Sequence, residues 1–386
     1  MLRLLHTADV HLGARHADLG EQAAAQRERQ FAAFQATVNL AIAEKVDVVL
    51  IAGDLFDSNT QPRRSVERVA AELKRLVAAR IRTVIIPGTH DVYDRSSVYR
   101  VHDLAALAGS PDGQDLVTLL TPERSSIHLG ACDVVVHGTV FATKRAPHSP
   151  LRDLRVGGGA DNATWHVGLV HGSLAIPDRT DRDEVVFTRE EIAASGLDYL
   201  ALGHWHSTQQ GTAGSTTWAY AGAPEPVAVT QDGAGKVLLV ELNESNGTRT
   251  VVVQERVVGR TRFDKLDVDA ATIADQPALV ALIAARADPD LVLDTRLSGV
   301  RRDELDISVE EVEEQLKGSF LKLRVRDRSL PALTEGTLPS PDTIPGAFIR
   351  AVEGRIAELE ADDLRVGDHA SRRRFRRTSS RASGTL

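Results

Sequence analysis

The chain has 386 residues, 42% hydrophobic and 26% charged, so it can form two or three globular domains and shows no compositional sign of disorder. A single cysteine, Cys132, excludes a disulfide framework, and the net charge of −8 argues against a protein that coats nucleic acid through charge alone. No apolar run could span a bilayer, and Asp9 comes too early for a signal peptide, so we expect a cytoplasmic protein with no membrane partner.

Short β-branched runs alternate with segments of helical period in the first part of the chain. We expect the runs to be strands, and we expect helices where apolar residues recur every three or four positions. In chain order these segments are Leu2–Ala8, 21–44, Val46–Ala52, 62–80 and Thr83–Pro87. The alternation predicts an α/β fold with a sheet covered on both faces.

The pattern changes after Pro224, where a smaller α+β unit is expected. Before that point, strands are expected at 133–141, 165–170, 199–202 and 216–220. Beyond it we expect a hairpin around Asn246-Gly247, with strands at 237–242 and 248–258, then a helix at 270–286, a strand at 291–298, a helix at 309–317 and a strand at 321–325.

The remainder divides by composition. A Pro-, Ser- and Thr-rich stretch at 331–346 indicates a linker, and 347–364 is expected to be an amphipathic helix. The basic, Ser-rich end at 365–386 is expected to be a disordered tail, although its arginine run could bind DNA.

Aspartate and histidine gather in five short segments, most of which directly follow an expected strand. The segments are Asp9-Val10-His11, Gly53-Asp54-Leu55-Phe56-Asp57, Gly88-Thr89-His90-Asp91, His171-Gly172 and Gly203-His204-Trp205-His206. Open α/β sheets present their sites at the carboxyl ends of strands. Alternate residues of an extended segment share a side, so Asp9 and His11 are expected to clamp a metal ion, and His204 and His206 could do the same if their segment is extended.

Carboxylate and imidazole together suit manganese, iron or zinc, whereas calcium prefers oxygen ligands alone. In two-metal sites the ions lie roughly 3.5–4 Å apart, so one carboxylate can bridge them. Asp54 follows the tight turn at Gly53 and is the candidate for that bridge.

These segments resemble those of the calcineurin-like metallophosphoesterases, and within them the DNA repair exonucleases of the SbcD and YhaO type. The segments most similar to that branch are 6–13, 51–57 and 202–206, and the resemblance extends from residue 1 to about Glu225. It implies a β-sandwich core flanked by helices (αββα) at 1–225 and a capping domain at 226–330.

The resemblance also implies two ions, with manganese as the metal. One ion would be held by Asp9, His11, Asp54 and His206, and the other by Asp54, His171 and His204. The family usually has asparagine at the position of Thr89, where its side-chain oxygen binds the second ion. The threonine hydroxyl is shorter and lacks the amide carbonyl, so we expect that ion to be held more weakly.

His90 matches the family's proton donor, which would protonate the departing sugar oxygen. Asp57 matches a carboxylate that orients this histidine in some relatives, and such a partner would raise the pKa of the imidazole and fix its tautomer. Capping of the next helix is an almost equal alternative for Asp57.

Other polar residues have simpler interpretations. Structural roles are expected for the histidines at positions 6, 102, 128 and 166, and turn roles for Asp91 and Asp94. His137-Gly138 repeats the dipeptide of His171, but it lies inside a Val-rich strand, so His171 is preferred. Arg63 and Arg64 are candidates for contact with a phosphate backbone, although solvation of a helix surface is the simpler explanation.

Three functions compete. The first is a manganese-dependent DNA exonuclease of DNA repair, associated with the nucleoid, which would act with an SMC-like ATPase of the SbcC type and could form a homodimer. The second is a phosphomonoesterase or cyclic-nucleotide phosphodiesterase of the same fold, which the capping unit argues against. The third is a non-catalytic DNA-binding scaffold, which the presence of His90 and His171 argues against.

Overall fold

A computed structural model of the chain describes residues 1–110, 114–156, 163–178, 180, 185–226, 231, 233–302, 305–331, 340, 342–344, 346–356 and 358. The chain divides into two compact units. The larger comprises Met1–Asp267, Pro277–Arg296 and Ser308–Arg326, and the smaller comprises Val268–Gln276, Leu297–Ile307 and Asp327–Leu386. No helix in the described ranges is long and apolar enough to cross a membrane.

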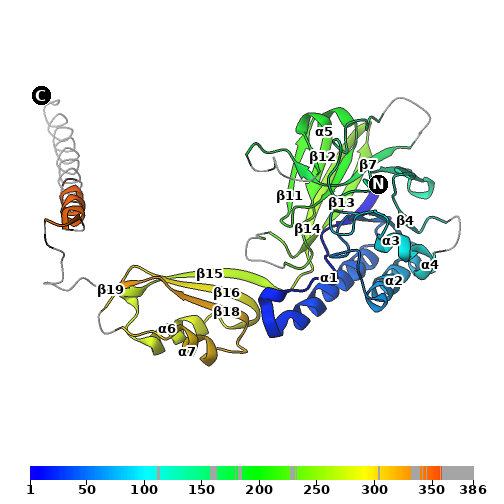
Figure 1. Ribbon diagram of the computed structural model, residues 1–386. Coiled ribbons are helices and arrows are strands. Elements are labelled where there is room, and N and C mark those ends of the chain that lie inside the picture. Colours follow the sequence, from blue (N-terminus) through cyan, green and yellow to red (C-terminus); the bar gives the residue numbers. More distant parts are fainter. Residues whose placement is uncertain are drawn as a thin grey trace, which may run out of the picture. The chain divides into compact units, whose positions relative to one another are not determined.

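Two six-stranded sheets form most of the larger unit (Figure 1). The first has the order β14-β13-β1-β2-β3-β4, with β1 Leu2–Thr7, β2 Val48–Ala52, β3 Arg82–Ile86, β4 Val117–Leu119, β13 Lys236–Ser245 and β14 Thr248–Val257. Strands β1 to β4 are parallel, and the hairpin β13–β14 extends them antiparallel through β1.

The second sheet has the order β11-β12-β10-β7-β6-β5, and its four inner strands are parallel. Its strands are β5 Ser126–Leu129, β6 Val134–His137, β7 Trp165–His171, β10 Tyr199–Gly203, β11 Gln209–Ala213 and β12 Thr216–Tyr220. A short parallel pair, β8 Ser173–Leu174 and β9 Val186–Phe187, follows β7 in the chain.

Strand β2 shows how the two sheets are joined. Alternate residues of a strand face opposite sides, so Leu50 enters the core shared with the second sheet, while Val49 and Ile51 face the helices. Burial on both faces explains why the strand reads as a continuous apolar run. Each sheet is thus buried on both faces, as predicted, but one face is covered by the other sheet and only the opposite face by helices.

Helices pack on the outer face of each sheet. Phe34 of α1 and Leu73 of α2 pack against the first sheet, and Ile192 of α5 packs against the second. The layers therefore run helix, sheet, sheet, helix, which confirms the αββα fold class. The helices and turns of this region are η1 Ala17–Gln22, α1 Ala23–Ala43, α2 Arg63–Ala78, α3 Val98–Val101, α4 Leu104–Leu107, η2 Gly130–Cys132 and α5 Arg189–Ser195.

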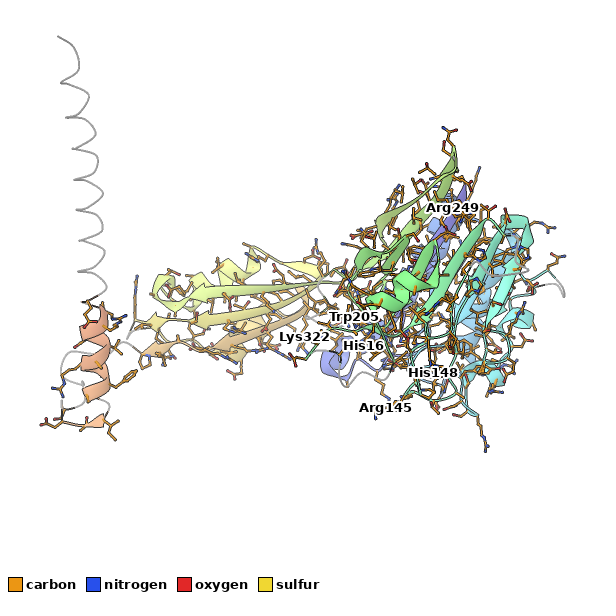
Figure 2. The ribbon with its side chains drawn as sticks, turned by 90° about the horizontal axis from the view of Figure 1, so that it is seen from above. His16, Arg145, His148, Trp205, Arg249 and Lys322 are labelled. Atoms are coloured by element: carbon orange, nitrogen blue, oxygen red, sulfur yellow. The ribbon has the colours of Figure 1, made fainter. Side chains whose placement is uncertain are left out.

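Arg249 ties the β13–β14 hairpin of the first sheet to the second sheet, and it is labelled in Figure 2. Its guanidinium lies over the ring of Trp165, 5.2 Å from the centroid, and Nη1 lies 3.0 Å from Oδ1 of Asp198. Both partners belong to the second sheet or the turn leading into it, so this residue links the two sheets away from the strand ends that carry the histidines.

A smaller three-stranded sheet has the order β15-β16-β18, with β15 Arg262–Asp269, β16 Asp288–Ser298 and β18 Phe320–Asp327. Figure 1 shows α6, Gln276–Ala284, and α7, Val309–Gln315, along one face of it. The helix expected at 270–286 is replaced by a turn, η3 Ala270–Thr272, and by α6. Pro277 lacks an N–H and suits only the first turn of a helix, which explains this later start.

In the smaller unit, β17 Val300–Arg301 pairs in parallel with β19 Leu330–Pro331. Helical residues are described at 344, 346–356 and 358, which overlap the helix expected at 347–364. The basic tail and most of the expected linker lie outside the described residues. The domain boundary at 225 stays a prediction.

Candidate metal centre

The carboxyl ends of five parallel strands carry all the predicted ligand positions. Strands β1, β2 and β3 lead into the segments of Asp9, Asp54 and His90, while β7 ends at His171 and β10 leads into His204. The two sheets approach closely at these ends: a Cβ added to Gly203 of the second sheet would collide with the carbonyl oxygen of Ala52 in the first. The fold therefore brings together residues that are far apart in the sequence.

The backbone at the site is left-handed rather than extended. The φ angles of Asp9, His11, Asp54 and His204 are 52°, 49°, 51° and 102°. Asp9 and His11 do lie in one cluster, as expected. The reason given for it, an extended segment, was wrong, since β1 ends at Thr7 and both residues have positive φ angles. Aspartate and histidine enter this region more readily than most residues, and such conformations gather at functional sites.

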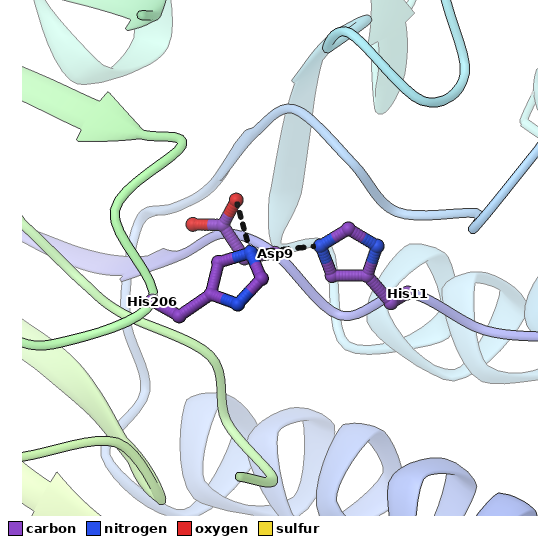
Figure 3. Close-up of side chains that lie close together, drawn as sticks. All are labelled: Asp9, His11 and His206. Atoms are coloured by element: carbon purple, nitrogen blue, oxygen red, sulfur yellow. Dashed lines mark hydrogen bonds and ion pairs between the residues drawn. The ribbon is translucent and has the colours of Figure 1, made fainter. Parts of the chain in front are cut away.

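Asp9, His11 and His206 form the first cluster (Figure 3). Nε2 of His206 lies 3.1 Å from Nε2 of His11 and 4.0 Å from Oδ1 of Asp9. His11 and Asp9 are buried, and His206 is half-buried. One metal ion could contact all three side chains.

Asp54 lies between the first cluster and His171. Its Oδ2 is 3.2 Å from Nε2 of His171 and 3.8 Å from Nε2 of His11, while its Oδ1 accepts a 2.8 Å hydrogen bond from the main-chain N–H of His90. One carboxylate oxygen of Asp54 therefore lies near two imidazoles. Asp54, Asp9 and His171 form the second cluster.

His204 and Thr89 flank the second cluster. The main-chain N–H of His204 lies 3.0 Å and 3.1 Å from the two carboxylate oxygens of Asp9, and the His204 ring meets that of His171 edge-on, with centroids 5.2 Å apart. Thr89 is buried in the loop after β3, between Gly88 and His90. Its role as a ligand stays a prediction.

The carboxylate of Asp57 lies closer to His11 than to His90. Oδ1 is 3.3 Å from Nδ1 of His11 and 3.8 Å from Nδ1 of His90, and His90 Nδ1 instead lies 3.0 Å from the main-chain oxygen of Asp57. The side chain of His90 is 48% exposed, so it stands at the rim of the site, where a substrate could reach it.

The buried charges of the centre shift one another's pKa values. Burial raises the pKa of Asp9 to about 6 and lowers the pKa of His206 to about 3. Burial opposes the shifts at His171 and Asp54, but their attraction prevails, raising the pKa of His171 to about 10 and lowering that of Asp54. The buried carboxylates of Asp9 and Asp54 lie within 4.8 Å of each other. Two such charges need a positive partner, which a divalent ion would provide.

The side chains present fit divalent metals. Nε2 of His171 is buried and, among the described residues, has no hydrogen-bond partner. It instead lies 3.2 Å from Oδ2 of Asp54 as an ion pair, and this nitrogen and oxygen could both contact a divalent ion that replaces the proton between them. The mixed nitrogen and oxygen donors favour a borderline transition ion over calcium.

The remaining predicted residues lie away from the clusters. Arg63 pairs with Glu67 at 2.7 Å on the surface of α2, where Arg64 is also exposed. Neither contacts the ligand cluster through a described interaction, and their role with substrate stays a prediction. Asp94 accepts from Ser96 in a turn, as expected.

Sequence reasoning missed Gln231, whose side-chain amide contacts Nδ1 of His206. No motif marks this residue, and it follows His206 by 25 positions. Trp205, labelled in Figure 2, lies between two predicted ligand histidines, stacks on Tyr220 and donates a 3.1 Å hydrogen bond to Ser173. The aromatic pair thereby anchors the His204–His206 turn.

Comparisons with known proteins agree with this geometry. The model of the calcineurin-like phosphoesterase family matches residues 2–208. The chain is 30% identical over 277 residues to the DNA double-strand break repair protein Mre11 of Aeropyrum pernix, covering 70% of this chain and 64% of that protein. It is 25% identical to the uncharacterized metallophosphoesterase YhaO of Bacillus subtilis, covering 73% of this chain and 66% of that protein.

A third relative is a subunit of the nuclease SbcCD of Rhodobacter capsulatus, which is 27% identical over 75% of this chain and 77% of that protein. The chain spans less than two thirds of the length of the Aeropyrum and Bacillus relatives. These similarities confirm the predicted resemblance to metallophosphoesterases and to proteins of the SbcD and YhaO type.

Proposed function

The chain belongs to the calcineurin-like phosphoesterase family, and from this premise we propose that it is a metal-dependent nuclease subunit of DNA repair. In this proposal it hydrolyses phosphodiester bonds as an exonuclease with two manganese ions. The observation that carries the proposal is the position of Asp54, whose Oδ2 faces the imidazoles of both His11 and His171.

Different side chains would bind the two ions. Asp9, His11 and His206 would hold one ion, His171 and His204 would hold the other, and Asp54 would bridge them. When bound, the two ions would lower the pKa of water and neutralise charge on the phosphate.

His90 is the proposed general acid. Its Nδ1 lies 3.0 Å from the main-chain oxygen of Asp57, so Nδ1 carries a proton and Nε2 is left to deliver a second proton to the leaving oxygen. Its exposure at the rim of the site allows this ring to approach a leaving group without displacing a metal ligand.

The relatives' names support DNA as the substrate, because two of the three are a double-strand break repair protein and a nuclease subunit. The name of the SbcCD subunit supports a second protein as partner, and we propose an SMC-like ATPase of the SbcC type. A homodimer and a cytoplasmic, nucleoid-associated location belong to the same proposal.

Release of nucleotides from end-labelled linear DNA tests the proposal. The purified chain with Mn²⁺ should digest DNA, and His90→Ala should lower the rate about 10²- to 10⁴-fold, the usual contribution of a general acid. The control variant His102→Ala changes a histidine that lies outside the clusters. Hydrolysis of a small aryl phosphodiester without DNA digestion would favour a phosphodiesterase of the same fold, and DNA binding without hydrolysis would favour a scaffold.

A further inference from the structure

Three ligand histidines share one arrangement of their ring nitrogens. Their Nε2 atoms face the clusters, whereas each Nδ1 is held from behind by a second group. Nδ1 of His171 lies 2.9 Å from the carbonyl oxygen of Ala52, and Nδ1 of His11 lies 3.3 Å from Oδ1 of Asp57. Nδ1 of His206 contacts the side-chain nitrogen of the Gln231 amide.

The group behind Nδ1 decides whether Nε2 can bind a metal. A neutral imidazole carries one proton, and an acceptor at Nδ1 draws that proton there and leaves the Nε2 lone pair for the ion. The carbonyl of Ala52 is main chain and cannot be removed by substitution. Asp57 and Gln231 hold their histidines through side chains, so their contribution can be tested.

The main chain fixes Asp57 beside His11. Beyond the ends of β1 and β2 the two segments continue side by side, because His11 N–H donates to Asp54 O at 2.9 Å and Asp57 N–H donates to Leu12 O at 3.1 Å. Leu12 and Phe56 form a parallel bridge between these two bonds. The contact between the Asp57 carboxylate and His11 is therefore built by the backbone and does not depend on His90.

Gln231 approaches His206 from the segment between β12 and β13. The amide can present either its oxygen or its NH₂ to Nδ1, and the two orientations differ by a half-turn of the terminal amide. Only the orientation with the oxygen toward Nδ1 leaves Nε2 of His206 unprotonated. Metal binding at Nε2 would therefore select that orientation.

We propose that Asp57 and Gln231 are positioning residues for the first ion, which hold His11 and His206 in the tautomer whose Nε2 faces Asp9. The proposal rests on the proposed metal-dependent function. It assigns the Asp57 carboxylate to a ligand histidine, whereas the resemblance assigns it to His90, which the main-chain oxygen of Asp57 already holds.

Isothermal titration of Mn²⁺ into the chelator-treated full chain tests this assignment without measuring turnover. Asp57→Leu and Gln231→Leu should each weaken the affinity for one ion about 10- to 100-fold, as lost outer-shell partners of metal ligands typically do. Asp57→Asn and Gln231→Glu keep an oxygen acceptor, so they should retain most of the wild-type affinity. Asp153→Leu, which replaces an exposed carboxylate elsewhere, is the matched control.

Thermal unfolding in chelator should show that all five variants fold. Wild-type affinity in both leucine variants would overturn the proposal. A loss in Asp57→Leu that is confined to turnover and to the alkaline limb of its pH profile would also overturn it, because that pattern assigns Asp57 to His90. If the wild type binds Mn²⁺ and the affinities follow the predicted order but DNA is not digested, the nuclease proposal fails and this inference stands.

Discussion

The hydroxyl of Tyr99 donates a 2.5 Å hydrogen bond to Oδ2 of the fully buried Asp91. Asp91 also accepts from the main-chain N–H of Phe56 at 3.1 Å and from that of Gly88 at 2.7 Å. One carboxylate thus joins the turn that carries Asp54 to the turn that carries His90. Asp91 therefore has a structural role beside the candidate metal centre, in a turn as the sequence predicted.

Asp91→Ala should therefore destabilise the apo protein strongly. The change leaves two main-chain N–H groups and one phenol without an acceptor, at about 1–3 kcal/mol for each buried group, so the free energy of unfolding should fall by about 3 kcal/mol or more. Tyr99→Phe removes one donor and should cost about 1–3 kcal/mol. Urea unfolding in chelator measures both, and a loss below about 1 kcal/mol in Asp91→Ala would contradict this account.

Gly88 is the second structural requirement of the centre. A Cβ at this position would lie 2.6 Å from the main-chain N of Asp54 and would collide with its carboxylate. Gly88→Ala should therefore displace the candidate bridging ligand, lower the free energy of unfolding by about 1–3 kcal/mol and weaken Mn²⁺ binding.

The matched control for this change is Gly130→Ala, where an added Cβ meets nothing within 4 Å. It should change the free energy of unfolding by no more than about 0.5 kcal/mol and leave Mn²⁺ binding as in the wild type. Unfolding curves and metal titrations of the two variants give the comparison. Equal behaviour of the two alanines would show that the space at Gly88 does not matter.

Thr89→Asn should strengthen the second ion. The buried Thr89 occupies the position where the resemblance expects an asparagine ligand, and the amide carbonyl reaches further than the threonine hydroxyl. The Mn²⁺ concentration needed for half-maximal activity should fall on the order of tenfold, equivalent to about 1.4 kcal/mol. The control is Thr89→Val, which has neither oxygen, and the same Mn²⁺ dependence in all three proteins would exclude a ligand role for this position.

The strands that carry the centre could be predicted from the sequence because their residues are apolar on both faces. Val48–Ala52 and Arg82–Ile86 lie almost where the β-branched runs indicate. The edge strand Gln209–Ala213 was missed, since it is largely polar and gives no such signal. The strand expected at 133–141 begins at Val134, because Asp133 is left-handed with φ of 52°, and it ends earlier than expected, at His137.

The candidate residues of the centre could be predicted from the sequence, but their backbone geometry and their contacts could not. Motif order identified Asp54 and His171, whereas pattern reasoning placed His11 on an extended segment that turns out to be left-handed. No motif marks the contact of Gln231 with His206 or that of Tyr99 with Asp91, and only the fold reveals them.

His6 should make stability depend on pH. It is fully buried in β1, with Nδ1 2.9 Å from the hydroxyl of Tyr199 in β10, and burial lowers its pKa to about 3. In the unfolded chain the pKa is about 6.5, so between these values the unfolded state binds a proton that the folded state does not. The stabilisation is complete above pH about 6.5 and is lost as the pH falls, by up to about 1.4 kcal/mol per pH unit. Urea unfolding in chelator from pH 7.5 to 4.5 should therefore show a shallower pH dependence in His6→Gln than in the wild type, and parallel curves would mean that His6 is protonated in the folded chain.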